Sequence, residues 1–167
     1  YNYVANTTTS LVSSANPSVS GQSVTFTATV TADAGTATGS VNFYNGAVLM
    51  GSANLTAGVA TFVTSSLSLG AGQNITAVYA RNFNFNGSTS SAVSQTVIQA
   101  GTVATLLAAP NPSVFGQSVT FTATVAAVAP GSGTPTGTAT FYDGATLLGS
   151  GSLSSGTATY NTASLAV

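Results

Sequence analysis

The chain has 167 residues and almost no charge: one Lys or Arg, two Asp or Glu, no His, no Cys and a formal net charge of -1. Apart from tyrosines, its ionisable side chains are Asp33, Arg81 and Asp143, which are too few for acid–base catalysis, a metal site or the neutralisation of nucleic-acid phosphates. No run approaches the roughly 20 consecutive apolar residues that cross a bilayer, so we expect no enzyme, cofactor, metal, nucleic-acid partner or membrane span.

Alternating apolar and hydroxyl-bearing residues predict β-strands along the chain, and no segment has helical spacing. The run SVTFTATV, from Ser23 to Val30, places Val24, Phe26 and Ala28 on one face and threonines on the other. This is the pattern of a half-buried strand. In the first hundred residues such patterns predict strands at 7–14, 22–31, 38–44, 47–55, 58–65, 73–80 and 89–99.

Two dipeptides mark tight turns between strand-like runs. Asn45-Gly46 and Asp143-Gly144 are pairs that favour the positive φ angles of a short hairpin. Because the uncharged Asn45 takes the place of Asp143 in the first half of the chain, we expect a turn role for Asp143 and not a catalytic one.

One string of fifteen residues occurs twice. NPSVSGQSVTFTATV begins at Asn16 and NPSVFGQSVTFTATV begins at Asn111, and the offset between the copies later grows from 95 to 98 residues. The extra residues lie near Pro130, in a segment that is typical of a surface loop. Short strands at this spacing indicate a sandwich or barrel, so we expect an all-β chain with two tandem domains, 1–100 and 101–167.

Longer phrases of the sequence resemble a known family. The chain contains TTTSLVSSANPSVSGQSVTFTATV, TGSVNFYNGAVLMGSANL, GVATF and QNITAVYARNFNFNGSTSSAVSQTV. Together these resemble the bacterial immunoglobulin-like repeat domains found in tandem on large secreted and cell-surface proteins. The resemblance covers essentially the whole chain and implies two immunoglobulin-like β-sandwiches, an extracellular or cell-surface location and no catalytic residues.

The second repeat stops short of the first. Its final TATYNTASLAV corresponds to residues 59–69, so nothing in it matches residues 70–99, where the last two strands of the first repeat are expected. A sandwich without those strands exposes core residues such as Phe121 and Phe141. It also leaves open sheet edges that invite pairing with another chain.

Two hypotheses for the unfinished repeat stay open. A neighbouring subunit could donate a strand, for example its N-terminal segment with Tyr1, Tyr3 and Val4. Alternatively, the chain is an excerpt of a longer tandem array in which the missing strands follow.

The near absence of charge indicates association, because self-repulsion and charged sheet edges are what keep β-proteins apart. We expect a non-enzymatic extracellular structural protein, a subunit or repeat segment of a surface filament or fibre, that forms a homopolymer or continues a longer array. The alternative is an adhesive or carbohydrate-binding module on a cell-surface stalk.

One loop is the candidate for binding a ligand. The segment ARNFNFNGS carries Arg81, Phe83 and Phe85, and exposed aromatic rings beside Asn can stack on sugars, while Arg is enriched at interfaces. The alternative is a loop that closes one end of the sandwich or packs on the next domain.

Four sequons permit N-linked glycosylation without being more frequent than chance. They lie at Asn6, Asn54, Asn74 and Asn86. Glycans are therefore partners that the sequence allows.

With no Cys, the first domain depends on packing for its stability. Tyr79 is expected either to donate its hydroxyl to the backbone, as in the tyrosine corner of such sandwiches, or to serve in plain core packing. The predicted core is Val24, Phe26, Val30, Val41, Phe43, Phe62, Ile75, Ala77 and Tyr79.

Overall fold

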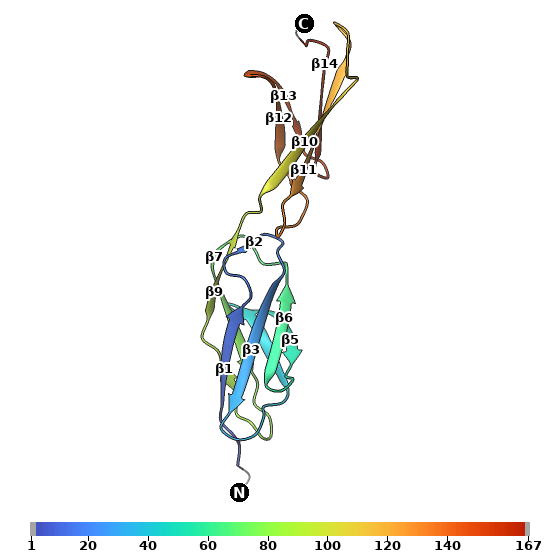
Figure 1. Ribbon diagram of the computed structural model, residues 1–167. Helices are drawn as coiled ribbons and strands as arrows, with labels where there is room; N and C mark the ends of the chain where they lie inside the picture. Colours follow the sequence, from blue (N-terminus) through green and yellow to red (C-terminus); the bar gives the residue numbers. More distant parts are fainter. Residues whose placement is uncertain (1–2, 166–167) are drawn as a thin grey trace. The chain divides into compact units, whose positions relative to one another are not determined.

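The computed structural model describes residues 3–165. These residues form β-strands joined by turns, with no helix among them, which confirms the all-β prediction. The chain divides into two compact units: unit 1 at residues 1–99 and unit 2 at residues 100–167. Figure 1 colours unit 1 from blue to yellow-green and unit 2 from yellow to red.

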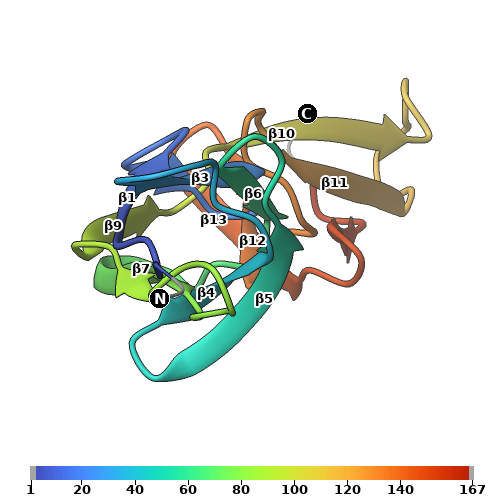
Figure 2. The ribbon, with the colours of Figure 1, turned by 90° about the horizontal axis from the view of Figure 1, so that it is seen from below.

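Unit 1 is a sandwich of two β-sheets. Its strands are β1 (Thr7–Ser13), β2 (Ser18–Val19), β3 (Val24–Ala32), β4 (Ser40–Asn45), β5 (Val48–Asn54), β6 (Val59–Thr64), β7 (Gly70–Tyr79), β8 (Ser88–Thr89) and β9 (Val93–Ile98). One sheet has the order β1-β3-β6, and the other has the order β2-β9-β7-β4-β5 with β8 beside β7. The two layers face each other in Figure 2.

The two-residue alternation decides which face of each strand is buried. Along β3, Val24, Phe26, Ala28 and Val30 are buried, whereas the intervening threonines are more exposed. A β-branched threonine suits the outer face of a pleated sheet. The predicted half-buried strand is therefore confirmed.

The predicted core of unit 1 is confirmed with one difference. Eight of the nine predicted residues are buried, and Phe62 is only partly buried, at the rim of the core. Its ring stacks on Phe43 with centroids 5.5 Å apart. Gly51 makes room for this ring, because a Cβ at that position would lie 2.5 Å from Phe62 Cε2.

Glycine forms both predicted hairpin turns. Gly46 has a φ of 58° and Gly144 a φ of 56°, a region in which a residue with a Cβ is strained. The preceding residues, Asn45 and Asp143, are still paired as the last residues of their strands. Asp143 thus has the same position as the uncharged Asn45, as expected for a turn residue.

Unit 2 repeats the first part of unit 1. Its strands are β10 (Thr102–Ala109), β11 (Val119–Ala127), β12 (Thr138–Asp143), β13 (Thr146–Ser152) and β14 (Thr157–Thr162). They form the sheets β10-β11-β14 and β12-β13. The loop that contains the inserted residues, 128–137, joins β11 to β12 in place of the shorter loop at residues 33–39.

The seven strands predicted for the first repeat correspond to β1, β3, β4, β5, β6, β7 and β9. The structure adds the two-residue strands β2 and β8, which the sequence did not predict. Within the described residues, unit 2 has no counterpart of β7 or β9, which confirms that its last two strands are missing from this chain.

Candidate functional site

The open side of unit 2 is the candidate site. In unit 1, β4 lies between two neighbours and pairs with both β5 and β7. Among residues 3–165, its counterpart β12 pairs with β13 alone. One edge of β12 therefore presents unpaired backbone groups, which is the usual template for adding a strand.

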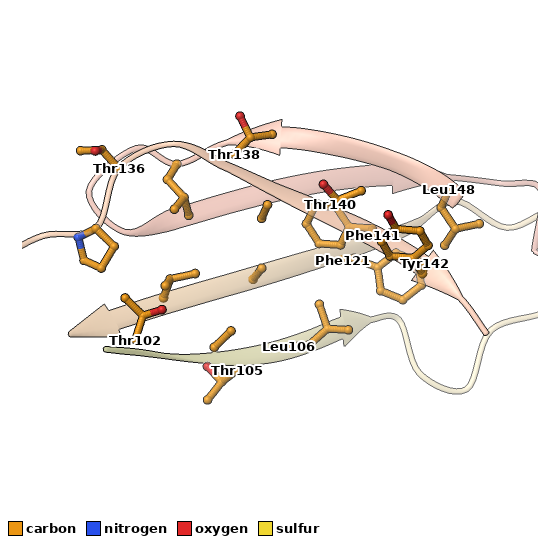
Figure 3. Close-up of a pocket in the computed structure, with 16 residues that line it drawn as sticks. Thr102, Thr105, Leu106, Phe121, Thr136, Thr138, Thr140, Phe141, Tyr142 and Leu148 are labelled. Carbon is orange, nitrogen blue, oxygen red and sulfur yellow. The ribbon is translucent and has the colours of Figure 1, made fainter. Parts of the chain in front are cut away.

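An apolar pocket lies between the two sheets of unit 2. Its volume is about 530 Å³. Phe121, Phe141 and Leu148 lie in the space between the strands, and Leu106 points into it from β10 while Thr105 points away (Figure 3). The pocket is thus the uncovered half of a sandwich core.

The two units provide an internal comparison of burial. Leu11 packs against the core of unit 1, whereas its counterpart Leu106 is 62% exposed. Phe26 is fully buried, whereas its counterpart Phe121 is only partly buried. The residue types are identical, so the difference comes from the strands that cover them in unit 1.

In unit 1 the covering strands are β7 and β9. Ile75, Ala77 and Tyr79 of β7 are buried against the core. In the antiparallel register, Phe43 lies opposite Ala77. The equivalent of Phe43 in unit 2 is Phe141, on the open edge of β12.

Tyr79 joins β7 to the loop before β4. Its hydroxyl donates a hydrogen bond of 2.7 Å to the carbonyl oxygen of Thr38 and accepts one of 3.1 Å from Asn82 Nδ2. Burial raises the pKa of this phenol, and the hydrogen bond from Asn82 opposes that rise. The predicted hydrogen bond to the backbone is therefore present, together with core packing.

Gln95 of β9 is a fully buried polar side chain that sequence reasoning missed. Ser13 Oγ donates a hydrogen bond of 2.7 Å to its Oε1, and its Nε2 donates to the carbonyl oxygen of Ala15 at 2.8 Å. Its Nε2 also donates to Ser18 Oγ at 3.1 Å. An inward-facing Gln between Val93 and Val97 was the signal in the sequence.

The predicted ligand loop separates its two aromatic residues. Phe83 is 98% exposed and, with Arg81 and Asn82, lines a shallow surface pocket. Phe85 is instead 7% exposed and belongs to the core of unit 1. A ligand at this loop would meet Arg81 and Phe83 but not Phe85, because Phe85 bridges to Ala5 and packs inward.

The described part of the predicted strand-exchange segment lies against unit 1. The backbone nitrogen of Ala5 donates to the carbonyl oxygen of Asn84 at 2.8 Å, and Tyr3 donates its hydroxyl to Asp33 at 2.7 Å. Val4 is partly buried. Tyr1 lies outside the described residues.

Residues 11–98 and 106–167 each match the bacterial Ig-like domain (group 3) family. The chain belongs to this family. Bacterial Ig-like domains are typically extracellular modules and are generally non-catalytic. No curated protein matches the sequence.

Two solved structures are similar to this bacterial Ig-like chain. The fibronectin(III)-like modules of Clostridium thermocellum CbhA match 94% of this chain and 79% of theirs, at 20% identity and a TM-score of 0.43. The human OSCAR ligand-binding domain matches over 96% of this chain and 83% of its own, at 15% identity and a TM-score of 0.41.

The four sequons of this bacterial Ig-like chain are all exposed. At two of them the side-chain Nδ2, the atom to which an N-linked glycan is attached, donates a hydrogen bond. Asn6 Nδ2 donates to Asp33 at 3.2 Å, and Asn86 Nδ2 donates to Asn6 Oδ1 at 3.0 Å. Glycosylation of Asn6 or Asn86 would disturb these contacts.

Residues 3–165 hold no group of three or more His, Cys, Asp or Glu side chains that could bind a metal. Within the same residues there is no helix of the length and hydropathy needed to cross a membrane.

Proposed function

We propose that the chain is a non-catalytic structural segment of an extracellular surface fibre. The observation that carries this proposal is the open face of unit 2. Unit 2 has the same core residues that β7 covers in unit 1, but in the described residues no strand covers them. In the proposed fibre, β-strands from outside the described residues complete this face. The strands come from a neighbouring subunit or from the next part of a tandem array.

The low charge of the chain supports association through strand edges. β10 has the sequence TVATLLAA, and Val103, Leu106 and Leu107 on it are each more than half exposed. No Lys, Arg, Asp or Glu lies on this strand. Charged residues on edge strands are the common protection against sheet-to-sheet pairing, and β10 lacks that protection.

Electron microscopy and sedimentation of the native material at neutral pH test the proposal. We expect continuous fibres with a regular axial repeat, or stalks in which every sandwich is complete. A chain that remains monomeric at high concentration, with its unit 2 open and unglycosylated, would rule out the fibre.

The exposed ring of Phe83 supports a second candidate function, adhesion through the loop of unit 1. An aromatic face beside a guanidinium group suits a sugar ring. A glycan array probed with the chain and with Phe83→Ala tests it. Loss of a specific glycan signal in the variant supports adhesion, and equal signals for both proteins exclude it; Tyr142→Ala, on unit 2, is the control for an exposed aromatic residue.

A further inference from the structure

The sequence contains two Asn-Gly dipeptides, and the structure places them in different surroundings. They are Asn45-Gly46, at the hairpin between β4 and β5, and Asn86-Gly87, in the loop between β7 and β8. Glycine has no Cβ to shield its backbone nitrogen, so this nitrogen readily attacks the side-chain carbonyl carbon of a preceding Asn. The attack converts asparagine to aspartate or isoaspartate without an enzyme.

The reaction needs only the chain and water. The glycine nitrogen forms a bond to the Asn Cγ, the bond from Cγ to Nδ2 breaks, and the proton of the glycine N–H leaves with the departing ammonia. Water then opens the cyclic succinimide at either of its carbonyl carbons, which gives aspartate or isoaspartate. Because the glycine nitrogen is the nucleophile, a hydrogen bond that holds its N–H must break first and slows the reaction.

The nitrogen of Gly46 is held in the sheet. It donates a hydrogen bond of 2.8 Å to the carbonyl oxygen of Asn74. Asn45 is itself the last residue of β4 and is paired with Val48 of β5 and Ile75 of β7. Attack at Asn45 therefore requires local opening of the hairpin end.

The nitrogen of Gly87 has no such partner. Among residues 3–165 it donates no hydrogen bond, and both Asn86 and Gly87 are exposed. The fold also requires a glycine here, because a Cβ at this position would lie 2.9 Å from the carbonyl oxygen of Tyr79. The loop therefore keeps an exposed Asn in front of a glycine whose nitrogen is free to react.

Asn86 attaches the first described residues of the chain to unit 1. Its backbone nitrogen donates to the carbonyl oxygen of Ala5 at 2.8 Å, and its carbonyl oxygen accepts from Thr7 Oγ1 at 2.7 Å. Its Nδ2 donates to Asn6 Oδ1 at 3.0 Å, and Asn6 Nδ2 in turn donates to Asp33 at 3.2 Å. The side chains thus form a relay in which both hydrogen bonds point toward the Asp33 carboxylate.

A carboxylate at position 86 breaks this relay. It only accepts hydrogen bonds, so it faces Asn6 Oδ1 with no proton between them. Rotation of the Asn6 amide would restore that hydrogen bond but lose the one to Asp33, and the two carboxylates would repel each other. In isoaspartate the main chain passes through Cγ, so the carbonyl group that accepts from Thr7 becomes part of a carboxylate, and the spacing to Ala5 changes.

We propose that Asn86 is a site of spontaneous deamidation and that its modification releases residues 3–7 from unit 1. Asn45, which is also followed by glycine, stays intact in the folded chain. The modification adds a negative charge to a chain that has very few. This inference does not depend on how unit 2 is completed.

The first test is the rate of deamidation in the full 167-residue chain. The chain is kept at mildly alkaline pH in water labelled with a heavy oxygen isotope, and peptide mass spectrometry measures the label at each dipeptide. We expect Asn86 to react at least about tenfold faster than Asn45, because a hydrogen bond and local pairing protect Asn45. In denaturant the two rates should become similar. If Asn86 reacts no faster than Asn45 in the folded chain, the proposal is overturned.

The second test compares Asn86→Asp, which has the charge of one product, with Asn84→Asp. The Asn84 side chain is exposed in the same loop and takes no part in the relay. Exchange of the Ala5 amide, which donates to the carbonyl oxygen of Asn84, should be about fivefold faster than in the native chain for Asn86→Asp, the factor for one lost hydrogen bond. It should be unchanged for Asn84→Asp. Slow exchange of the buried Ile75 amide shows that both variants are folded.

The aged chain gives the same comparison for the natural products. Because the formal net charge is only -1, the added carboxylate separates modified from unmodified chains by anion exchange. The Ala5 amide should exchange faster in the modified fraction. Equal exchange in the two fractions, or in Asn86→Asp and the native chain, would overturn the release of residues 3–7.

Discussion

The hydroxyl of Tyr79 donates a hydrogen bond of 2.7 Å to the carbonyl oxygen of Thr38, 41 residues earlier in the chain. Tyr79→Phe removes this bond and keeps the buried ring. We expect the free energy of unfolding of unit 1 to fall by about 1 kcal/mol, the usual net contribution of one hydrogen bond. Denaturant titration followed by NMR signals of the unit 1 core measures the change.

Tyr142→Phe is the matched control for this prediction, since Tyr142 is 59% exposed and lies in unit 2. Its free energy of unfolding should stay the same within error. If Tyr79→Phe also has no effect, the ring of Tyr79 serves in core packing alone.

The same phenol predicts a loss of stability at alkaline pH. Burial raises the pKa of Tyr79 above its ordinary value of 10.0. A raised folded pKa means that the contribution to stability is fully present below about pH 10 and is lost as the pH rises through the folded pKa. Thermal unfolding of unit 1 between pH 8 and pH 12 should show this loss, and Tyr79→Phe should reduce it. Equal pH profiles for both proteins would contradict the assignment.

Asp33 predicts a smaller effect at the acidic end. The hydrogen bond from the Tyr3 hydroxyl, supported by hydrogen bonds from Asn6, holds the pKa of the Asp33 carboxyl below its ordinary 3.8. Its contribution to stability is present above that value and is lost as the pH falls through the folded pKa. We expect Tyr3→Phe to raise the pKa of Asp33 toward 3.8 in an NMR titration of its carboxyl carbon. Tyr142→Phe should leave that pKa unchanged, and a Tyr3→Phe titration equal to the native one would exclude the contact.

The buried hydrogen bond between Ser13 and Gln95 gives a further prediction. Ser13→Ala leaves Gln95 Oε1 without its donor, so the free energy of unfolding of unit 1 should fall by about 1–3 kcal/mol. Ser10→Ala, on the exposed face of the same strand, is the control and should have little effect. Adding Gln95→Leu to Ser13→Ala should recover the part of the loss that comes from the unpaired Oε1, but not the part that comes from the carbonyl oxygen of Ala15, which accepts from both side chains in the native chain. Denaturant titration of the native chain, the three single variants Ser13→Ala, Gln95→Leu and Ser10→Ala, and the double variant measures this, and additive losses in the double variant would contradict it.

Much of the fold could be predicted from the sequence, because the two-residue alternation records directly which face of a strand is buried. SVTFTATV predicted β3 and its core face correctly, and the repeat predicted its copy β11. The strands β2 and β8 were missed since two residues are too short to show a period.

The site was harder to predict because it depends on contacts between distant segments. Phe83 and Phe85 occupy equivalent places in the phrase NFNFNG, yet only Phe85 is buried, through a bridge to Ala5 some 80 residues earlier. The alternation could not show that contact. Gln95 was missed for a related reason, because its partner Ser13 lies on a strand 82 residues earlier in the chain.

The most direct test of the account is hydrogen exchange of the backbone amides of β4 and β12 in the same molecule. In the chain alone we expect slow exchange across residues 40–45 and fast exchange at the unpaired edge of residues 138–143, because exchange follows local pairing. A saturating synthetic peptide with the sequence of residues 70–98, the segment that covers the core of unit 1, should slow exchange in β12 and leave β4 unchanged. Equal protection of the two strands in the chain alone, or no change in β12 when peptide is added, would contradict an open second unit that is completed by added strands.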